Sequence, residues 1–140
     1  LGLPHTSFFE PTGIEEENVS TAREYAKFAL HAFGRQDLGR YTGTVVRTVT
    51  AQTDGTTKRL MNTNWMLWKP EYDDVYVTSS KTGYLEESNW NLAVSLRPSA
   101  SDPRELLIVL FGAGSRAQSF VDAHALVHWA WDNHEWTERQ

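Results

Sequence analysis

Three consecutive residues, Lys81, Thr82 and Gly83, place an ammonium group, a hydroxyl and a bare backbone unit within a run of β-formers. On an extended strand side chains alternate, so Lys81 and Gly83 are expected on one face and Thr82 and Tyr84 on the other. A lysine held beside a hydroxyl is suited to anchoring a carboxylate or moving a proton. Because Gly83 lacks a Cβ, an extended ligand can lie against the strand there. The tripeptide alone is also typical of a strand end with a solvated lysine.

Strands on either side must position these residues. Residues 75–80 alternate in polarity and lead into Lys81, and Asn89–Leu96 is expected to form the next strand. Glu105–Gly112 is apolar on both faces, which predicts a central, fully buried strand. A long turn, residues 97–104, precedes it. Strands joined by turns indicate an antiparallel sheet.

Two helices are expected to cover that sheet. Ser20–Phe33 has apolar residues at helical spacing, and Thr21 with Glu24 fits a capping box at its start. Ala117–Trp136 is a second, closing amphipathic helix, and Trp129 is expected on its buried face.

The remaining segments complete an α/β fold. Residues 1–18 contain prolines and a glycine and are expected to be irregular. Asp54-Gly55 lies between two β-rich runs, which is a strong hairpin signal. The order helix, hairpin, three strands, helix predicts a single α/β unit with helices layered on an antiparallel sheet. A chain of 140 residues is long enough for one core and too short for two.

Composition excludes several function classes. The net charge is −5, without a clustered basic patch, which argues against a nucleic-acid partner. There is no cysteine, so neither a disulfide nor a thiolate metal site is available. No apolar run approaches the roughly 20 residues of a membrane span, and no signal segment is evident.

A metal or other cofactor is not expected from the sequence. His124, His128 and Asp132 recur at four-residue spacing on the closing helix. The segment lacks the glutamate of the His-Glu-x-x-His zinc motif, and no second ligand-bearing segment is evident. The residues are therefore interpreted as a polar helix face.

Several stretches together resemble one family in the same order along the chain. The sequence resembles the D-alanyl-D-alanine carboxypeptidases among the low-molecular-mass penicillin-binding proteins, peptidase family S11. The tripeptide Lys-Thr-Gly is the third sequence element of penicillin-binding proteins and serine β-lactamases. The stretches that carry the resemblance are residues 1–13 (a Pro-x-Gly loop), 20–30 (a Ser-Thr-Ala helix start), 62–67 (an Asn-x-Asn element), 81–84 (Lys-Thr-Gly-Tyr) and 106–131 (a last strand and closing helix).

The resemblance implies a β-lactamase/transpeptidase-like fold and a role for each matched residue. Lys81 is expected to share the proton network of the site and to raise its positive potential. Thr82 is expected to hydrogen-bond the terminal carboxylate of a D-Ala-D-Ala stem peptide or of a β-lactam. The backbone N–H of Tyr84, beyond Gly83, is expected to be one of two oxyanion-hole donors.

The chain departs from the family pattern in three places. No serine is followed by a lysine three residues on, and no serine or tyrosine by an asparagine two residues on. The family's Ser-x-x-K nucleophile and Ser-x-Asn motif lie upstream of the Pro-x-Gly loop. In many members an arginine binds the substrate carboxylate where this chain has Ser119; Arg116, one turn earlier, is the alternative. Glu10 stands where the family usually has asparagine before Pro11.

These observations predict that residues 1–140 are the C-terminal part of a single penicillin-binding domain of the bacterial cell envelope, lacking its N-terminal half. On its own the chain is expected to be inactive. Its expected partner is a complementary segment carrying Ser-x-x-K, or self-association that replaces it. Two alternatives stay open: a non-catalytic module that binds peptidoglycan stem peptides, and a fragment of a serine β-lactamase.

Overall fold

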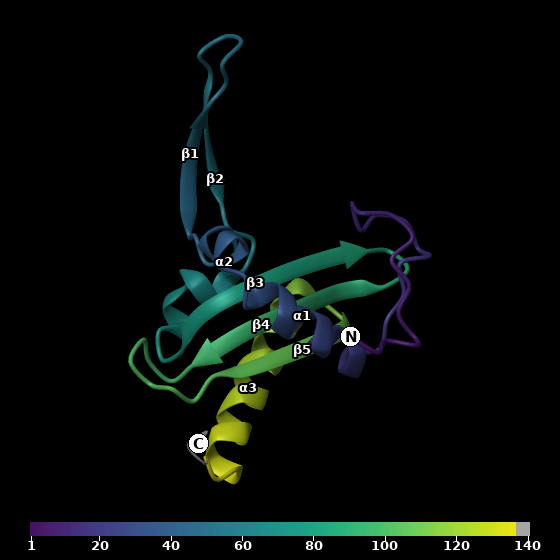
Figure 1. Cartoon of the computed structure of the whole chain (residues 1–140). Helices are drawn as coiled ribbons and strands as arrows, with labels where there is room; N and C mark the ends of the chain where they lie inside the picture. Colours follow the sequence, from purple (N-terminus) through teal and green to yellow (C-terminus); the bar gives the residue numbers. More distant parts are fainter. Residues whose placement is uncertain (137–140) are drawn as a thin grey trace.

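The computed structural model describes residues 1–136 and arranges them as a sheet between helices, with a separate hairpin (Figure 1). The elements in chain order are α1 (Ala22–Phe33), α2 (Gln36–Thr42), β1 (Val46–Thr50), β2 (Thr57–Met61), η1 (Trp65–Leu67), η2 (Pro70–Tyr72), β3 (Tyr76–Leu85), β4 (Asn89–Arg97), β5 (Leu106–Ala113) and α3 (Arg116–Asn133). The expected order is confirmed, and three short elements, the helix α2 and the 3-10 helices η1 and η2, are added to it.

The central sheet has three antiparallel strands in the order β3-β4-β5. The central strand is β4, in which Leu92 to Leu96 are all buried. The prediction that β5 is central and fully buried is wrong, because β5 is an edge strand and its residues are half-buried or exposed. Its apolar character on both faces has another cause: α1 contacts β5 as well as α3 does, so both of its faces are covered.

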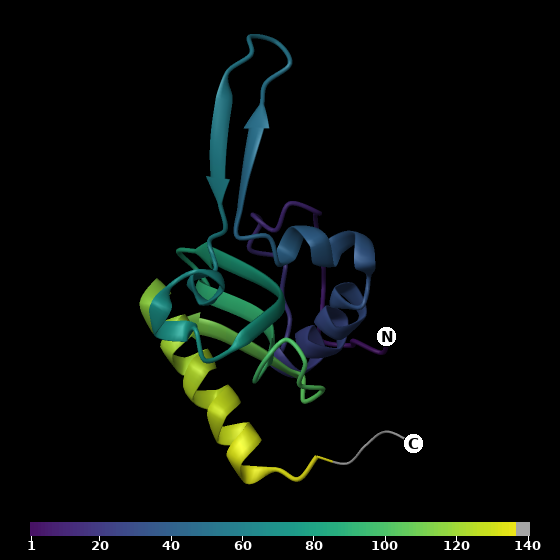
Figure 2. The same ribbon diagram turned by 90° about the vertical axis from the view of Figure 1, so that its left-hand side faces the viewer.

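Helices α1 and α3 lie on opposite faces of the sheet (Figure 2). The main core lies under α3, where Phe120, Ala123 and Val127 are fully buried against Leu92 and Leu96 of β4. On the other face, the Tyr25 ring of α1 meets the Phe111 ring of β5 edge-on at 5.4 Å between centroids. The expectation of helices covering a sheet is confirmed.

The buried tryptophan of α3 is not the expected one. Trp129 is 57% exposed, whereas Trp131 is 9% exposed and donates its indole N–H to the Arg104 carbonyl at 3.2 Å. Two residues along a helix turn a side chain by about 200°, so Trp129 points away from the face that Val127 buries.

The hairpin β1-β2 extends away from the sheet (Figures 1 and 2). Its strands pair from Val46↔Met61 to Thr50↔Thr57, and all their residues are exposed. The predicted Asp-Gly turn closes it, with Gly55 at φ 72° and the Asp54 carboxylate accepting the Thr56 N–H at 2.9 Å. Among the described residues, no helix is both long and apolar enough to cross a membrane.

Candidate active site

The four residues Lys81 to Tyr84 lie in the second half of β3, which is an edge strand. Lys81 is paired with Ala93 and Thr82 with Leu92. Directly opposed residues share a face, so Thr82 faces the α3 side with the buried Leu92, and Lys81 faces the α1 side. The alternation expected from sequence therefore holds.

Lys81 is exposed, and its ammonium donates a hydrogen bond to the backbone carbonyl of Thr82. Edge strands carry backbone groups that no neighbouring strand pairs. A ligand approaching this edge therefore meets a cation and free strand backbone together.

Thr82 is linked to the start of α3 through one intermediate residue. Its hydroxyl hydrogen-bonds the hydroxyl of Thr63 at 2.6 Å, and the Arg116 guanidinium donates to the Thr63 carbonyl at 2.6 Å. The guanidinium also lies over the Trp65 ring, 5.0 Å from its centroid. Packing on an aromatic face and a hydrogen bond to a carbonyl both restrict a long side chain, so Arg116 is held at this end of the sheet.

Ser119 stands where many family members have arginine; it lines the smaller groove, but its short side chain is turned back onto α3. It is 3% exposed, and its hydroxyl donates to the Arg116 carbonyl at 2.8 Å. The positive charge at the start of α3 therefore comes from Arg116.

Two asparagines position Thr63, which sequence reasoning did not single out. Asn62 donates to the Thr44 carbonyl at 3.0 Å and accepts the Asn64 N–H at 2.9 Å. Asn64 is fully buried and caps η1 by accepting the Met66 N–H at 3.0 Å. The Asn-x-Asn spacing was the available signal. Asn62 and Asn64 fix the backbone on both sides of Thr63, whose hydroxyl bonds that of Thr82 on β3.

Two grooves meet at the Lys-Thr-Gly strand. The larger, about 830 Å³, is lined by the N-terminal loop, α1 and the sheet, and includes Phe8, Phe28 and Phe111. The smaller, about 410 Å³, is lined by Thr63 and Arg116. Lys81, Thr82, Gly83 and Tyr84 line both.

Gly83 leaves room along the strand. A Cβ built there would meet its nearest side-chain atom, Asn91 Cβ, at 3.8 Å, which is an ordinary contact. Packing inside the described chain therefore does not require glycine at this position.

Glu10 organises the loop at the rim of both grooves. Its carboxylate accepts the N–H groups of Gly13 at 2.6 Å and Ile14 at 2.9 Å, and the Thr12 hydroxyl also donates to it. The hydrogen bonds from Thr12, then those from Asn18 and the Ile14 N–H, lower the pKa of the Glu10 carboxyl to about 2, although desolvation opposes them. An ionised carboxylate here replaces the asparagine usual in the family, and sequence reasoning noted the departure without its role.

The start of α1 is fixed to the same loop. Thr21 accepts the Glu24 N–H at 3.2 Å, which confirms that half of the capping box. The Glu24 side chain instead accepts the Thr6 hydroxyl at 2.6 Å and the His5 N–H at 3.0 Å. Burial works to raise the pKa of the Glu24 carboxyl, but these hydrogen bonds lower it.

Residues able to hold a metal lie elsewhere in the fold. His124 and His128 are brought together with Asp74, which precedes β3, while Asp132 is exposed one turn further along α3. This cluster is distinct from the groove residues.

The class of protein that the comparisons define is that of the D-alanyl-D-alanine peptidases. The chain belongs to the D-alanyl-D-alanine carboxypeptidase family, whose sequence pattern it matches over residues 1–114. It is 30% identical over 139 residues to D-alanyl-D-alanine carboxypeptidase DacF of Bacillus subtilis, covering 96% of this chain and 33% of that protein. It is 26% identical over 129 residues to a D-alanyl-D-alanine endopeptidase of Pseudomonas aeruginosa, covering 92% of this chain and 40% of that protein.

Solved structures confirm the β-lactamase/transpeptidase-like fold. A D-alanyl-D-alanine carboxypeptidase from Mycobacterium tuberculosis superposes with a TM-score of 0.76 at 16% identity, covering 95% of this chain and 49% of that one. A DD-transpeptidase variant from Streptomyces K15 gives a TM-score of 0.76 at 21% identity, covering 94% of this chain and 50% of that one. The chain thus spans about half of each solved structure and less of its curated relatives.

Proposed function

We propose that residues 1–140 form one wall of the active site of a serine D-alanyl-D-alanine carboxypeptidase. They would be the C-terminal part of a single penicillin-binding domain. In this proposal the complete site trims peptidoglycan stem peptides through an acyl-enzyme, and a β-lactam occupies the same position. The nucleophilic serine and its lysine are supplied by a segment outside the 140 residues.

One observation carries the proposal: the row of polar contacts from Thr82 through Thr63 to Arg116, beside a cationic edge strand. A terminal carboxylate at this position meets a hydroxyl and a guanidinium, and charge-assisted hydrogen bonds of this kind are the strong ones. Arg116 thereby takes the role that an arginine at position 119 has in many relatives.

Lys81 and Tyr84 act on the reacting end of the substrate. The Lys81 ammonium raises the positive potential beside the scissile carbonyl and joins its proton network. The Tyr84 N–H, on the edge strand, donates to the developing oxyanion, whose stabilisation by preorganised donors is a large term in acyl transfer. Gly83 lets the peptide lie close to the strand.

The larger groove supports the proposal that another polypeptide segment packs against this chain. Phe8, Tyr84 and Phe111 line it, and they are 52%, 50% and 42% exposed. Apolar groups gathered along one groove are typical of an interface. The proposed occupant is the complementary segment carrying Ser-x-x-K, or a second copy of the chain. Because the substrate is peptidoglycan, the completed domain acts in the bacterial cell envelope.

A chimera tests this proposal. The part of the Bacillus subtilis carboxypeptidase that precedes the matched region is fused upstream of Leu1, and labelling by a fluorescent penicillin is followed on denaturing gels. We expect the chimera to be labelled, and both the 140-residue chain alone and a chimera lacking the nucleophilic serine to remain unlabelled. Labelling of the isolated chain that resists boiling in detergent would contradict the proposal, as would a folded chimera that is never acylated.

A non-catalytic module that binds stem peptides is the second candidate. It is favoured by the absence of Ser-x-x-K from all 140 residues. Calorimetric titration of the isolated chain with a D-Ala-D-Ala peptide distinguishes this module from the enzyme proposed above. Tight binding that Arg116→Ala abolishes would favour the module, whereas the enzyme proposal expects weak or no binding until the second wall is present.

A further inference from the structure

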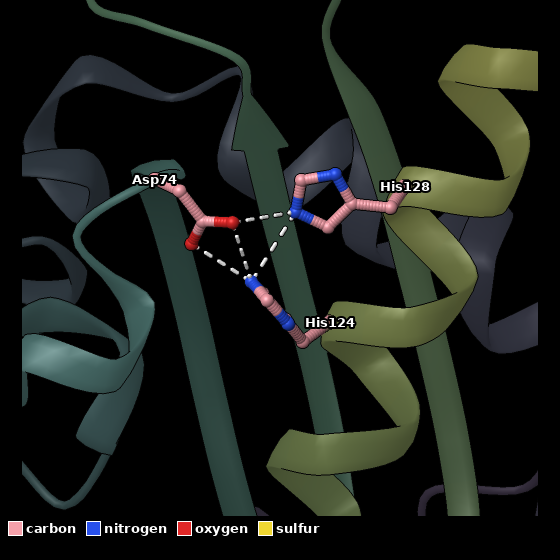
Figure 3. Close-up of side chains that lie close together, drawn as sticks. All are labelled: Asp74, His124 and His128. Atoms are coloured by element: carbon pink, nitrogen blue, oxygen red, sulfur yellow. Dashed lines mark hydrogen bonds and ion pairs between the residues drawn. The ribbon is translucent and has the colours of Figure 1, made fainter.

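Three side chains of the types that can bind a metal meet at the end of the sheet opposite to Lys81. His124 and His128 lie one turn apart on α3 and present their rings on the same face, and Asp74 reaches them from the segment before β3 (Figure 3). The His124 Nε2 is 2.8 Å and 3.0 Å from the two carboxylate oxygens of Asp74. The His128 Nε2 is 2.9 Å from one of those oxygens and 3.2 Å from the His124 Nε2.

These separations are hydrogen-bond and ion-pair distances, and they bring the three ligand atoms close enough together to share one cation. Tetrahedral zinc with bonds of about 2.0–2.2 Å places its ligand atoms about 3.3–3.6 Å apart. The observed separations of 2.8 to 3.2 Å are shorter than that value by about 0.1–0.8 Å, so the three side chains would move apart slightly to admit the ion. We propose that Asp74, His124 and His128 bind a divalent transition-metal cation, for which Zn²⁺ is the best fit.

The donor set matches this class of cation. Two imidazole nitrogens and one carboxylate suit zinc and neighbouring first-row metals, whereas magnesium and calcium prefer oxygen ligands alone. With three protein ligands, the fourth position of a tetrahedral ion remains for water. Asp74 has a side chain 49% exposed, so a cation can enter from solvent.

Buried aromatic residues hold the two imidazoles in place before any ion binds. The Tyr72 ring meets the His124 ring edge-on at 5.4 Å between centroids, and Trp131 meets His128 in the same way at 5.5 Å. Tyr72 and Trp131 are 6% and 9% exposed. Ligands fixed by packed neighbours lose less freedom when they bind, which favours affinity.

The location indicates a structural role. Asp74 lies in the turn before β3, and the strand from Tyr76 to Lys81 alone spans roughly 17 Å at about 3.3 Å per residue. The cation would connect α3 to the segment leading into β3, and it is independent of the proposed peptidase chemistry. A cation that binds the folded state alone stabilises that state.

The test titrates the 140-residue chain with Zn²⁺ after treatment with a chelator. We expect one equivalent to bind in calorimetry and the melting temperature to rise by roughly 5–10 °C at a hundredfold excess over Kd. Bound Co²⁺ should give the intense visible bands of a four-coordinate nitrogen and oxygen site. His128→Ala and Asp74→Ala should each weaken Zn²⁺ binding by roughly 10²-fold or more, as expected when one of three ligands is lost.

His134→Ala and Asp132→Asn are the matched controls, since both lie on or beside the end of α3, outside the cluster. Both should bind Zn²⁺ as the parent chain does. His124→Ala is a further ligand variant; if it fails to fold, the two more exposed ligand variants decide the outcome. Absence of Zn²⁺ binding by the parent chain, or binding unchanged in His128→Ala and Asp74→Ala, would overturn the proposal.

Discussion

The two ends of β3 carry polar clusters that the chain assembles in different ways. At one end, Lys81 to Tyr84 are consecutive residues, so the strand itself sets their spacing. At the other end, Asp74 meets two histidines that are 50 and 54 positions away in sequence. A site formed by consecutive residues of one strand can be predicted from the sequence. A site formed by distant segments can be identified only once the packing of the elements is known.

The first prediction concerns Lys81 and has the largest expected effect. In the chimera, Lys81→Ala should lower the rates of acylation and deacylation by about 10²–10³-fold, the scale of losing one preorganised charge or oxyanion donor. The melting temperature should hardly change, because an exposed charge contributes little to stability. Stopped-flow acylation kinetics beside thermal melts measure both.

If Lys81→Ala keeps full activity, or simply unfolds the protein, then the strand end is ordinary and the contrast between the two clusters disappears. Asp74→Ala in the same chimera is the useful control. Asp74 lies in the turn before β3, more than five strand residues from Lys81, and its substitution should leave acylation within about twofold.

The second prediction concerns the core beneath the Asp74 end. Trp131→Ala should destabilise the chain by about 3 kcal/mol, because it removes a large buried side chain that also packs on His128. Trp129→Ala, on the exposed face of the same helix, should change stability by less than about 0.5 kcal/mol. Urea unfolding followed by circular dichroism compares the two, and equal losses would mean that the burial of α3 has been misassigned.

The tryptophans also show what sequence reasoning could reach. Helical spacing identified α1 and α3, and Asp54-Gly55 identified the hairpin, because these signals are local. The wrong assignments, Trp129 as buried and β5 as central, share one cause. Apolar residues report that a face is covered, but they do not report which helix covers it or where a strand lies in the sheet.

The same limit applies to the site residues. Lys81 to Tyr84 were found because a contiguous motif needs no knowledge of packing, and their catalytic roles stay predictions. The link from Arg116 through Thr63 to Thr82 joins residues up to 53 positions apart, so one sequence does not contain it as a pattern. Asp74 was missed for the same reason, although its histidine partners were noticed from their spacing.

The third prediction tests whether that link recognises a carboxylate. In the chimera, Arg116→Ala should reduce kcat/KM for a peptide ending in free D-Ala by about tenfold, and Thr82→Val by somewhat less. Neither should alter turnover of the C-terminal amide to the same degree, because the amide lacks the charge that the guanidinium binds. Steady-state kinetics on the matched substrates provide the comparison.

Thr63→Val refines this result. It removes the hydroxyl that bonds Thr82 but keeps the Thr63 carbonyl that accepts from Arg116. We expect Thr63→Val to lower kcat/KM for the free-carboxylate peptide. If the double variant with Thr82→Val loses no more than Thr82→Val alone, Thr63 and Thr82 act as one hydrogen-bonded unit. Equal losses on the carboxylate and amide substrates would instead show that these residues only support the fold.

The last and smallest effect is expected at Glu10, which shapes the rim of the Lys81 end. Its pKa is lowered from 4.5 in a free carboxyl to about 2 in the fold, chiefly by the Thr12 hydroxyl. A lowered folded-state pKa stabilises the ionised form, so this contribution is complete above pH 4.5 and is lost as the pH falls towards 2. Glu10→Gln keeps the shape of the side chain but removes its charge and its titration. Between pH 5 and about 2, the parent chain should therefore lose stability faster than Glu10→Gln, and the gap between their melting temperatures should narrow. Because the carboxylate is exposed, the change in this gap should be small.

Glu16 is a nearby glutamate on the same loop, so Glu16→Gln is the matched control for Glu10→Gln and should follow the parent chain. A gap between parent and Glu10→Gln that stays constant across this range would show that the Glu10 carboxylate does not hold the loop through its charge.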